Sequence, residues 1–153
     1  MSEDQTPPMA RPRVAAGALF FDDEGRVLLV KPTYKVGWDI PGGYVEPSET
    51  PVEACRREVN EELGLDPWIG QLLVVDWAPS EAEGDKVLFV FDCGIMTEDS
   101  AARIVLPADE LSASAFHDPD VLDELMIDRL ARRVSVAIQA RRHGRTTYLE
   151  HGS

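Results

Sequence analysis

The spacing of the hydrophobic positions changes several times along the chain, and each change predicts an element. Two short apolar runs, 14–21 and 27–30, flank an acidic turn that contains Gly25, a pattern typical of a β-hairpin. Residues 50–63 then switch to a helical period. The apolar positions of this period, three or four residues apart, are Val52, Cys55, Val59 and Leu63. They predict a helix with one buried face.

The ends of this helix are indicated by residue type. Either Ser48 or Thr50 is suited to cap the first turn with a side-chain oxygen, and Pro51 suits the first helical position. Gly64 is placed to end the helix, because glycine readily adopts the left-handed backbone that follows a last turn.

The second half of the chain predicts further strands and a long helix. Residues 68–78 and 86–94 are strand candidates, and 103–106 is a shorter one. Residues 107–119 are expected to be irregular or briefly helical. The last apolar stripe predicts one amphipathic helix over 122–138.

This order of strands, helix, strands and helix predicts an α/β (α+β) fold with a mixed β-sheet between helices. A length of 153 residues suggests one domain. We expect a disordered, proline-containing lead at 1–12, a single domain at 13–143 and a C-terminal tail at 144–153.

The formal net charge of −13 argues against a polymeric nucleic acid as partner, because proteins that bind such polymers show a basic stripe. The lead lacks the apolar run of a signal peptide, and no stretch approaches the roughly 20 apolar residues that span a bilayer. We therefore expect a cytoplasmic protein with no membrane partner. In a reducing cytoplasm, Cys55 and Cys93 are expected to be buried thiols rather than a disulfide or a metal site.

Three glutamates gather on one edge of the predicted helix. Glu58, Glu61 and Glu62 stand at i, i+3 and i+4, so they point in nearly the same direction beside the apolar face. Like charges at these spacings destabilise an isolated helix. A bound cation would compensate them, and carboxylate oxygens are the ligands that Mg²⁺ or Mn²⁺ prefers.

A glutamate-rich helix is more often plain solvated surface, so the neighbouring residues decide the interpretation. Gly42 and Gly43 precede the helix and allow the backbone to approach a ligand closely. Glu49 lies just before the helix, and Arg57 adjoins the acidic run.

With these residues in place, the segment Gly43–Leu65 resembles the Nudix box. Every fixed position of that motif is filled, by Gly43, Glu49, Arg57, Glu58, Val59, Glu61, Glu62, Gly64 and Leu65. The preceding WDIPGG is also similar to the family pattern. The resemblance implies the Nudix α/β/α sandwich, with its mixed sheet between helices.

The resemblance also implies the roles of the residues. Glu58 and Glu62 would be the main metal ligands, and Glu61 would be a third ligand or would orient the attacking water. The carbonyl of Gly42 would be a further ligand. The metal would be Mg²⁺, with Mn²⁺ as a substitute.

Two further box residues would support the catalytic ones. Glu49 and Arg57 would form an ion pair that holds the loop against the helix. The implied activity is hydrolysis of the pyrophosphate bond in a nucleoside diphosphate linked to another moiety. Two alternatives stay open: a Nudix domain that senses a nucleotide without cleaving it, and a structural protein with an acidic helix.

The substrate and the outer parts of the site also stay open. The position of Pro79 resembles that of a proline in Nudix members that act on ADP-ribose, although an ordinary turn is an equally good interpretation. The short chain and single domain are also similar to members that hydrolyse nucleoside triphosphates such as oxidised dGTP. An additional acid from a later loop is expected, and the candidates are Glu81, Glu83 and, slightly favoured, Glu110. Stacking candidates are Tyr34, Trp38, Trp77 and Phe116, and phosphate-contacting candidates are Lys31, Lys35 and Lys86. A homodimer through the strand at 72–77 is also allowed.

Overall fold

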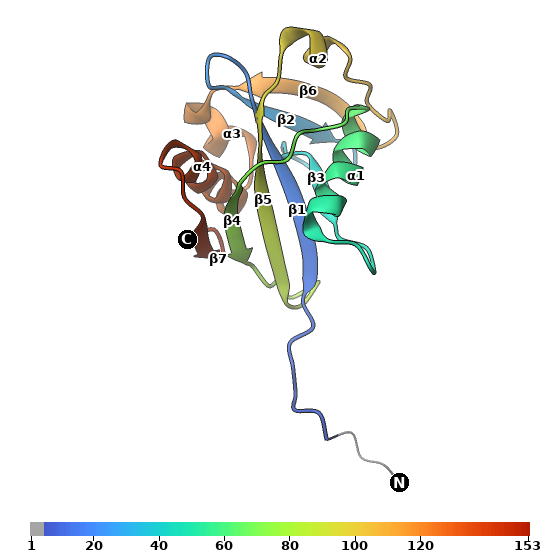
Figure 1. Ribbon diagram of the computed structural model, residues 1–153, viewed down its shortest axis with the longest axis vertical. Helices are drawn as coiled ribbons and strands as arrows, with labels where there is room; N and C mark the ends of the chain where they lie inside the picture. The colour runs from blue at the N-terminus through green and yellow to red at the C-terminus, as the bar shows by residue number, and fades with distance from the viewer. Residues whose placement is uncertain (1–4) are drawn as a thin grey trace.

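A computed structural model describes residues 5–153 as a mixed β-sheet between two layers of helices (Figure 1). The strands are β1 (Arg13–Phe21), β2 (Val27–Pro32), β3 (Gly42–Tyr44), β4 (Leu72–Trp77), β5 (Lys86–Ile95), β6 (Leu111–His117) and β7 (Thr147–Glu150). The helices are α1 (Pro51–Leu63), α2 (Glu98–Ala102), α3 (Leu122–Leu125) and α4 (Asp128–Arg142), with a 3-10 turn η1 (Pro119–Val121). The predicted fold class is confirmed.

The sheet runs in the order β6-β2-β1-β5-β4-β7, and β3 pairs with β1. The pairs β1/β5 and β4/β7 are parallel, and the other pairs are antiparallel. Figure 1 shows α1 on one side of the sheet, with α3 and α4 on the other. Because side chains alternate along a strand, Ala18 and Phe20 of β1 pack in the core under α1, whereas Leu19 and Phe21 pack in the core under α4.

Local sequence signals place α1 at its predicted position. The side chain of Thr50 accepts a hydrogen bond from the Glu53 backbone N–H, and the Glu53 side chain accepts one from Thr50 N–H. This reciprocal pair is a capping box. Gly64 ends the helix with a left-handed φ of 72°. Thr50, rather than Ser48, is therefore the cap.

The buried face of α1 differs at one predicted position. Cys55, Val59 and Leu63 are fully buried, but Val52 is 40% exposed and Ala54 is buried instead. Val52 lies in the first turn of α1, and the buried positions begin at Ala54. The two cysteines are buried and free, as expected.

Three predictions for the second half of the chain are wrong. Part of the stretch 107–119 is not irregular but forms β6, which pairs with β2 along its whole length. Residues 103–106 form no strand, and the short helix α2 precedes them. The single helix expected over 122–138 is divided into α3 and α4, because Met126 adopts an extended backbone.

The C-terminal residues are part of the sheet rather than a tail. β7 lies parallel to β4, with Leu149 opposite Asp76. The carboxylate of Asp76 is fully buried; it accepts hydrogen bonds from Arg133 Nε at 2.6 Å and from the Gly152 N–H at 3.1 Å. The domain therefore extends beyond residue 143.

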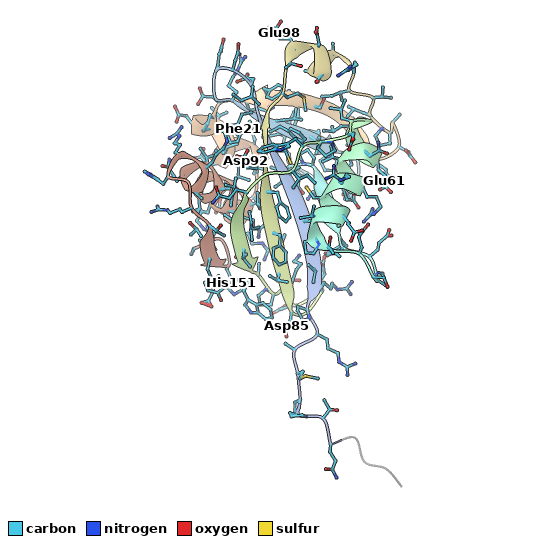
Figure 2. The ribbon with its side chains drawn as sticks, in the orientation of Figure 1. Phe21, Glu61, Asp85, Asp92, Glu98 and His151 are labelled. Carbon is cyan, nitrogen blue, oxygen red and sulfur yellow. The ribbon has the colours of Figure 1, made fainter. Side chains whose placement is uncertain are left out.

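Arg141 fixes the end of α4 to the sheet. Its guanidinium lies 4.2 Å from the centre of the Phe21 ring, and its Nε donates to the Asp92 carboxylate at 3.1 Å. Figure 2 labels Phe21 and Asp92 near the same end of the sheet.

Residues 5–12 form no regular secondary structure and are largely exposed. The prediction of a disordered lead falls partly on residues 1–4, which lie outside the described part of the chain. Within residues 5–153, every helix is too short or too polar to cross a membrane.

Candidate active site

Two glutamates of α1, Glu58 and Glu62, lie against the Gly42–Gly43 strand. The Glu62 carboxylate accepts a hydrogen bond from the Gly42 N–H at 2.9 Å. The Glu58 side chain is only 17% exposed. Glu61 is 55% exposed, and Figure 2 shows it on the outer side of α1. The helical spacing thus brings Glu58 and Glu62 against the glycine backbone and leaves Glu61 towards solvent.

The lack of a side chain matters at the two glycines for different reasons. Gly42 has a φ of 151°, and a Cβ there would lie 2.3 Å from the Ala16 carbonyl oxygen. A Cβ on Gly43 would lie 2.6 Å from the carboxyl carbon of Glu58. At Gly43 the missing side chain therefore leaves space for the Glu58 carboxylate itself.

Arg57 connects the loop before the helix to the carboxylates. Its Nε and Nη2 donate to the two carboxylate oxygens of Glu49 at 2.8 and 2.9 Å, and Nη2 also donates to the Tyr44 carbonyl at 3.0 Å. Its Nη1 donates to Glu58 at 2.9 Å and to Glu61 at 3.2 Å. A bidentate arginine–carboxylate pair combines strength with fixed geometry, so Arg57 orients both the loop and the helix carboxylates.

Glu49 and Arg57 each favour the charged state of the other. The Arg57 hydrogen bonds lower the pKa of Glu49 to about 2. In turn, the hydrogen bonds to Glu49 raise the pKa of Arg57 above its ordinary value. Both groups stay ionised throughout the range in which an enzyme works, which fits a positioning role rather than proton transfer.

The pKa values of the Glu58 and Glu62 carboxylates are shifted in the opposite direction, upwards. Burial raises the pKa of Glu62 to about 8, and the hydrogen bond from Gly42 opposes this rise only in part. Burial also raises the pKa of Glu58, and the negative charges of Glu61 and Glu110 add to the effect. Such shifts concentrate at functional sites. A bound cation would relieve both the burial cost and the repulsion.

Comparison with known proteins decides the family. A profile described as the NUDIX domain matches residues 11–137. The chain belongs to the Nudix family. The match covers most of the sheet as well as the box, so the family assignment does not depend on the motif alone.

Curated relatives match over part of the chain. An RNA pyrophosphohydrolase of Halorhodospira halophila is 46% identical over 57 residues, which are 37% of this chain and 30% of that protein. One from Pseudomonas savastanoi pv. phaseolicola is 40% identical over 63 residues, which are 41% of this chain and 38% of the relative. The aligned segments thus span well under half of these relatives.

Solved structures show the same fold over nearly the whole chain. A MutT protein from Methanosarcina mazei Go1 superposes with a TM-score of 0.71 at 23% identity, over 90% of this chain and 99% of that one. A MutT NUDIX hydrolase from Burkholderia pseudomallei gives 0.67 at 25% identity, over 86% and 98%. These likenesses concern the Nudix fold.

The Nudix residues form a donor set that fits a hard divalent cation, since Glu58, Glu61, Glu62 and the Gly42 carbonyl supply only oxygen atoms. Within residues 5–153, no three His, Cys, Asp or Glu side chains are already gathered around one point. Each box carboxylate instead has a protein partner, either Arg57 or the Gly42 N–H. A cation would replace these hydrogen bonds.

Among the later acids, Glu110 is the one that acts on the Nudix carboxylates, since its charge contributes to the raised pKa of both Glu58 and Glu62. Its backbone is held by Thr33, whose N–H donates to the Glu110 carbonyl at 2.9 Å and whose hydroxyl donates to the Asp109 carbonyl at 2.8 Å. Glu110 therefore belongs to the surroundings of the box.

Glu83, another candidate for the additional acid, contacts Tyr44 and Lys86. It accepts hydrogen bonds from the Tyr44 hydroxyl and from Lys86. Burial and the Glu83 carboxylate raise the pKa of Tyr44 to about 12. Glu83 therefore joins the loop after β4 to Tyr44 of β3, and Lys86 of β5 pairs with it.

Asp39 is a charged neighbour of the site that the sequence pattern does not single out. Its charge contributes to the raised pKa of Glu62, and its carboxylate accepts a hydrogen bond from Lys35 at 2.7 Å. In the sequence, only its position three residues before Gly42 indicates that Asp39 lies near the site.

The aromatic candidates divide into packed and exposed residues. Trp38 packs against the core in an edge-on contact with His117, with 4.7 Å between ring centres. Phe116 is partly buried and packs against the core under α1. Tyr34 is 77% exposed, so it is the stacking candidate left open to solvent near Lys35.

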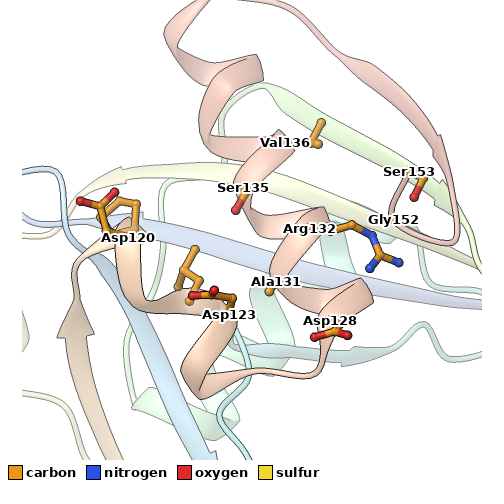
Figure 3. A pocket seen from close by; sticks show the side chains of 11 residues that line it. Asp120, Asp123, Asp128, Ala131, Arg132, Ser135, Val136, Gly152 and Ser153 are labelled. Atoms are coloured by element: carbon orange, nitrogen blue, oxygen red, sulfur yellow. The ribbon is translucent and has the colours of Figure 1, made fainter.

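A cavity of about 520 Å³ lies elsewhere, between η1, α4 and the C-terminal residues (Figure 3). Asp120, Asp123, Asp128 and Arg132 line it with Gly152 and Ser153. No residue of the Nudix box lines this cavity, so it is separate from the carboxylate site.

Proposed function

We propose that this Nudix protein is a divalent-metal-dependent hydrolase that cleaves the pyrophosphate bond of a nucleoside diphosphate linked to another moiety. The observation that carries the proposal is the pair of half-buried carboxylates, Glu58 and Glu62, held one turn apart against Gly42 and Gly43 with raised pKa values. The pyrophosphohydrolase names of the curated relatives support it.

In this proposal Glu58, Glu61, Glu62 and the Gly42 carbonyl hold Mg²⁺, or Mn²⁺ as a substitute. When bound, the ion supplies positive charge to the phosphate oxygens and lowers the pKa of a bound water. The rigid helix keeps the carboxylates in place, and the absence of a side chain at Gly43 gives the Glu58 carboxylate its room.

The remaining residues of the site orient the metal-binding carboxylates or accept a proton from the attacking water. Arg57 and Glu49 hold the loop 44–49 against α1, so they act through the carboxylates that they orient. A carboxylate oxygen of Glu61 or of Glu110 accepts the proton of the attacking water. Glu110 suits this role because Thr33 fixes its backbone beside the box.

We further propose a small nucleotide as the substrate, because a net charge of −13 disfavours the long-range approach of a polyanion. A 5′-phosphorylated RNA is the second candidate, since two RNA pyrophosphohydrolases are 46% and 40% identical to this chain over 57 and 63 residues. A cytoplasmic location and a homodimer through β4 remain predictions. Sedimentation of the purified chain tests the dimer.

A substrate panel tests the proposed reaction. Nucleoside triphosphates, ADP-ribose, dinucleoside polyphosphates, nucleotide sugars and triphosphorylated RNA are incubated with Mg²⁺, with Mn²⁺ or with EDTA. We expect metal-dependent cleavage of one class, and a loss of at least about a hundredfold in Glu58→Gln. Nucleotide binding without turnover of any substrate would instead identify a sensing domain.

A further inference from the structure

Trp68 is a large aromatic residue that the fold holds in an exposed position. Its side chain is 66% exposed. A Cβ on Gly70 would lie 2.3 Å from its ring, and a Cβ on Gly94 would lie 3.4 Å from the same ring. The indole therefore rests on two glycine backbones. A fixed, exposed aromatic ring offers a stacking surface at little cost in conformational entropy.

The ring borders a cavity of about 520 Å³ between the end of α1, the end of β5 and α2, in the region labelled Glu98 at the top of Figure 2. Its floor is apolar, with Phe20, Cys93 and Met96, all buried. The hydrogen bond that the Cys93 thiol makes to Cys55, together with burial, raises the pKa of Cys93, so this floor is uncharged. A cavity of this size, with an apolar floor and polar groups at its edge, can hold a small molecule.

The edge of the cavity carries one unbalanced positive charge. Asp66 pairs with Arg56 at 3.3 Å. Arg103 has no ion pair among residues 5–153, and one of its Nη atoms donates to the Ser100 hydroxyl at 3.2 Å. An exposed, unpaired guanidinium suits a phosphate or a carboxylate, which it binds with two hydrogen bonds.

We propose that this cavity is a second ligand site, which binds a planar aromatic anion such as a nucleoside monophosphate. The base stacks on Trp68, and the phosphate pairs with Arg103. Glu58, Glu61 and Glu62 do not line the cavity, so binding here does not need the divalent metal and does not depend on the proposed hydrolase activity.

Titration of AMP in EDTA by calorimetry tests the site. We expect binding by the wild type, and weakening by about tenfold or more in Trp68→Leu, which keeps an apolar side chain but loses the stacking ring. Trp68→Phe should keep part of the affinity. Arg103→Gln should weaken binding of AMP but not of adenosine. Arg142→Gln, at another exposed arginine, is the matched control and should bind like the wild type.

Three results would overturn the proposal. The first is the absence of AMP binding to the wild type in EDTA. The second is binding that Glu58→Gln abolishes and Trp68→Leu leaves intact, since AMP would then occupy the carboxylate site. The third is a change from dimer to monomer in Trp68→Leu, seen by sedimentation, which would make the surface an interface between copies. Unchanged melting temperatures confirm that each variant is folded.

Discussion

At the scale of a single residue, a methyl group at position 43 would occupy the space of the Glu58 carboxylate. Gly43 does not have a positive φ, so alanine fits the backbone and only the flexible end of Glu58 must move. We predict that Gly43→Ala keeps its fold and loses about a hundredfold in kcat/KM, as is usual for a displacement near 1 Å. Steady-state kinetics and thermal melting check this. An active Gly43→Ala would show that the position of this carboxylate does not matter.

The Glu49–Arg57 pair predicts a pH dependence of stability. The folded-state pKa of Glu49 is about 2, below its ordinary value of 4.5. Its ionised form therefore stabilises the fold fully above pH 4.5, and this contribution is lost as the pH falls towards 2. Urea unfolding at pH 6 and at pH 3 should show a smaller difference between wild type and Glu49→Gln at the lower pH. A difference that is equal at both pH values would contradict the depressed pKa.

At the scale of elements, the ion pair Asp76–Arg133 attaches α4 and the C-terminal strand to β4. Both side chains are buried, so removal of one partner leaves an unpaired charge. We predict that Asp76→Ala lowers the free energy of unfolding by about 3–5 kcal/mol. The double variant Asp76→Leu/Arg133→Met is the matched control and should lose much less. Denaturant titration of both variants measures the two effects.

The elements that the sequence pattern predicts are those whose signals are local. α1 has a capping threonine, a first-turn proline and a terminal glycine within its own segment. β6 reads SASAF in its centre, and small residues have little β-propensity. Its strand form depends on pairing with β2, distant in the chain. β7 has only four residues, and its partner β4 is also distant in the chain. A strand this short gives little periodic signal.

The site residues likewise divide into those with a local sequence signal and those brought together by tertiary packing. Helical spacing fixes which side chains share a face, so Glu58, Glu61 and Glu62 are predictable from the sequence. The Nudix resemblance adds Glu49 and Gly42. The proximity of Glu110 arises from tertiary packing of a separate loop, and no local pattern encodes it. For that reason the sequence leaves three later acids open.

At the scale of the whole molecule, the net charge of −13 predicts how salt affects substrate choice. Repulsion of a polyanion is strong at low ionic strength, where screening extends about 30 Å at 0.01 M, and weak at 0.15 M, where it extends about 8 Å. We predict that kcat/KM for triphosphorylated RNA, relative to a small nucleotide, rises as salt increases. An RNA preference at low salt that falls with added salt would indicate a basic docking surface.

The most direct test of the central claim is a Mn²⁺ titration followed by electron paramagnetic resonance, with hydrolysis measured on the same samples. The wild type and the exposed-site control Glu98→Gln should bind Mn²⁺ and cleave substrate. Glu58→Gln/Glu62→Gln should lose both properties and melt as a folded protein. If the double variant binds Mn²⁺ and turns over like the wild type, the carboxylates of α1 are not the metal site.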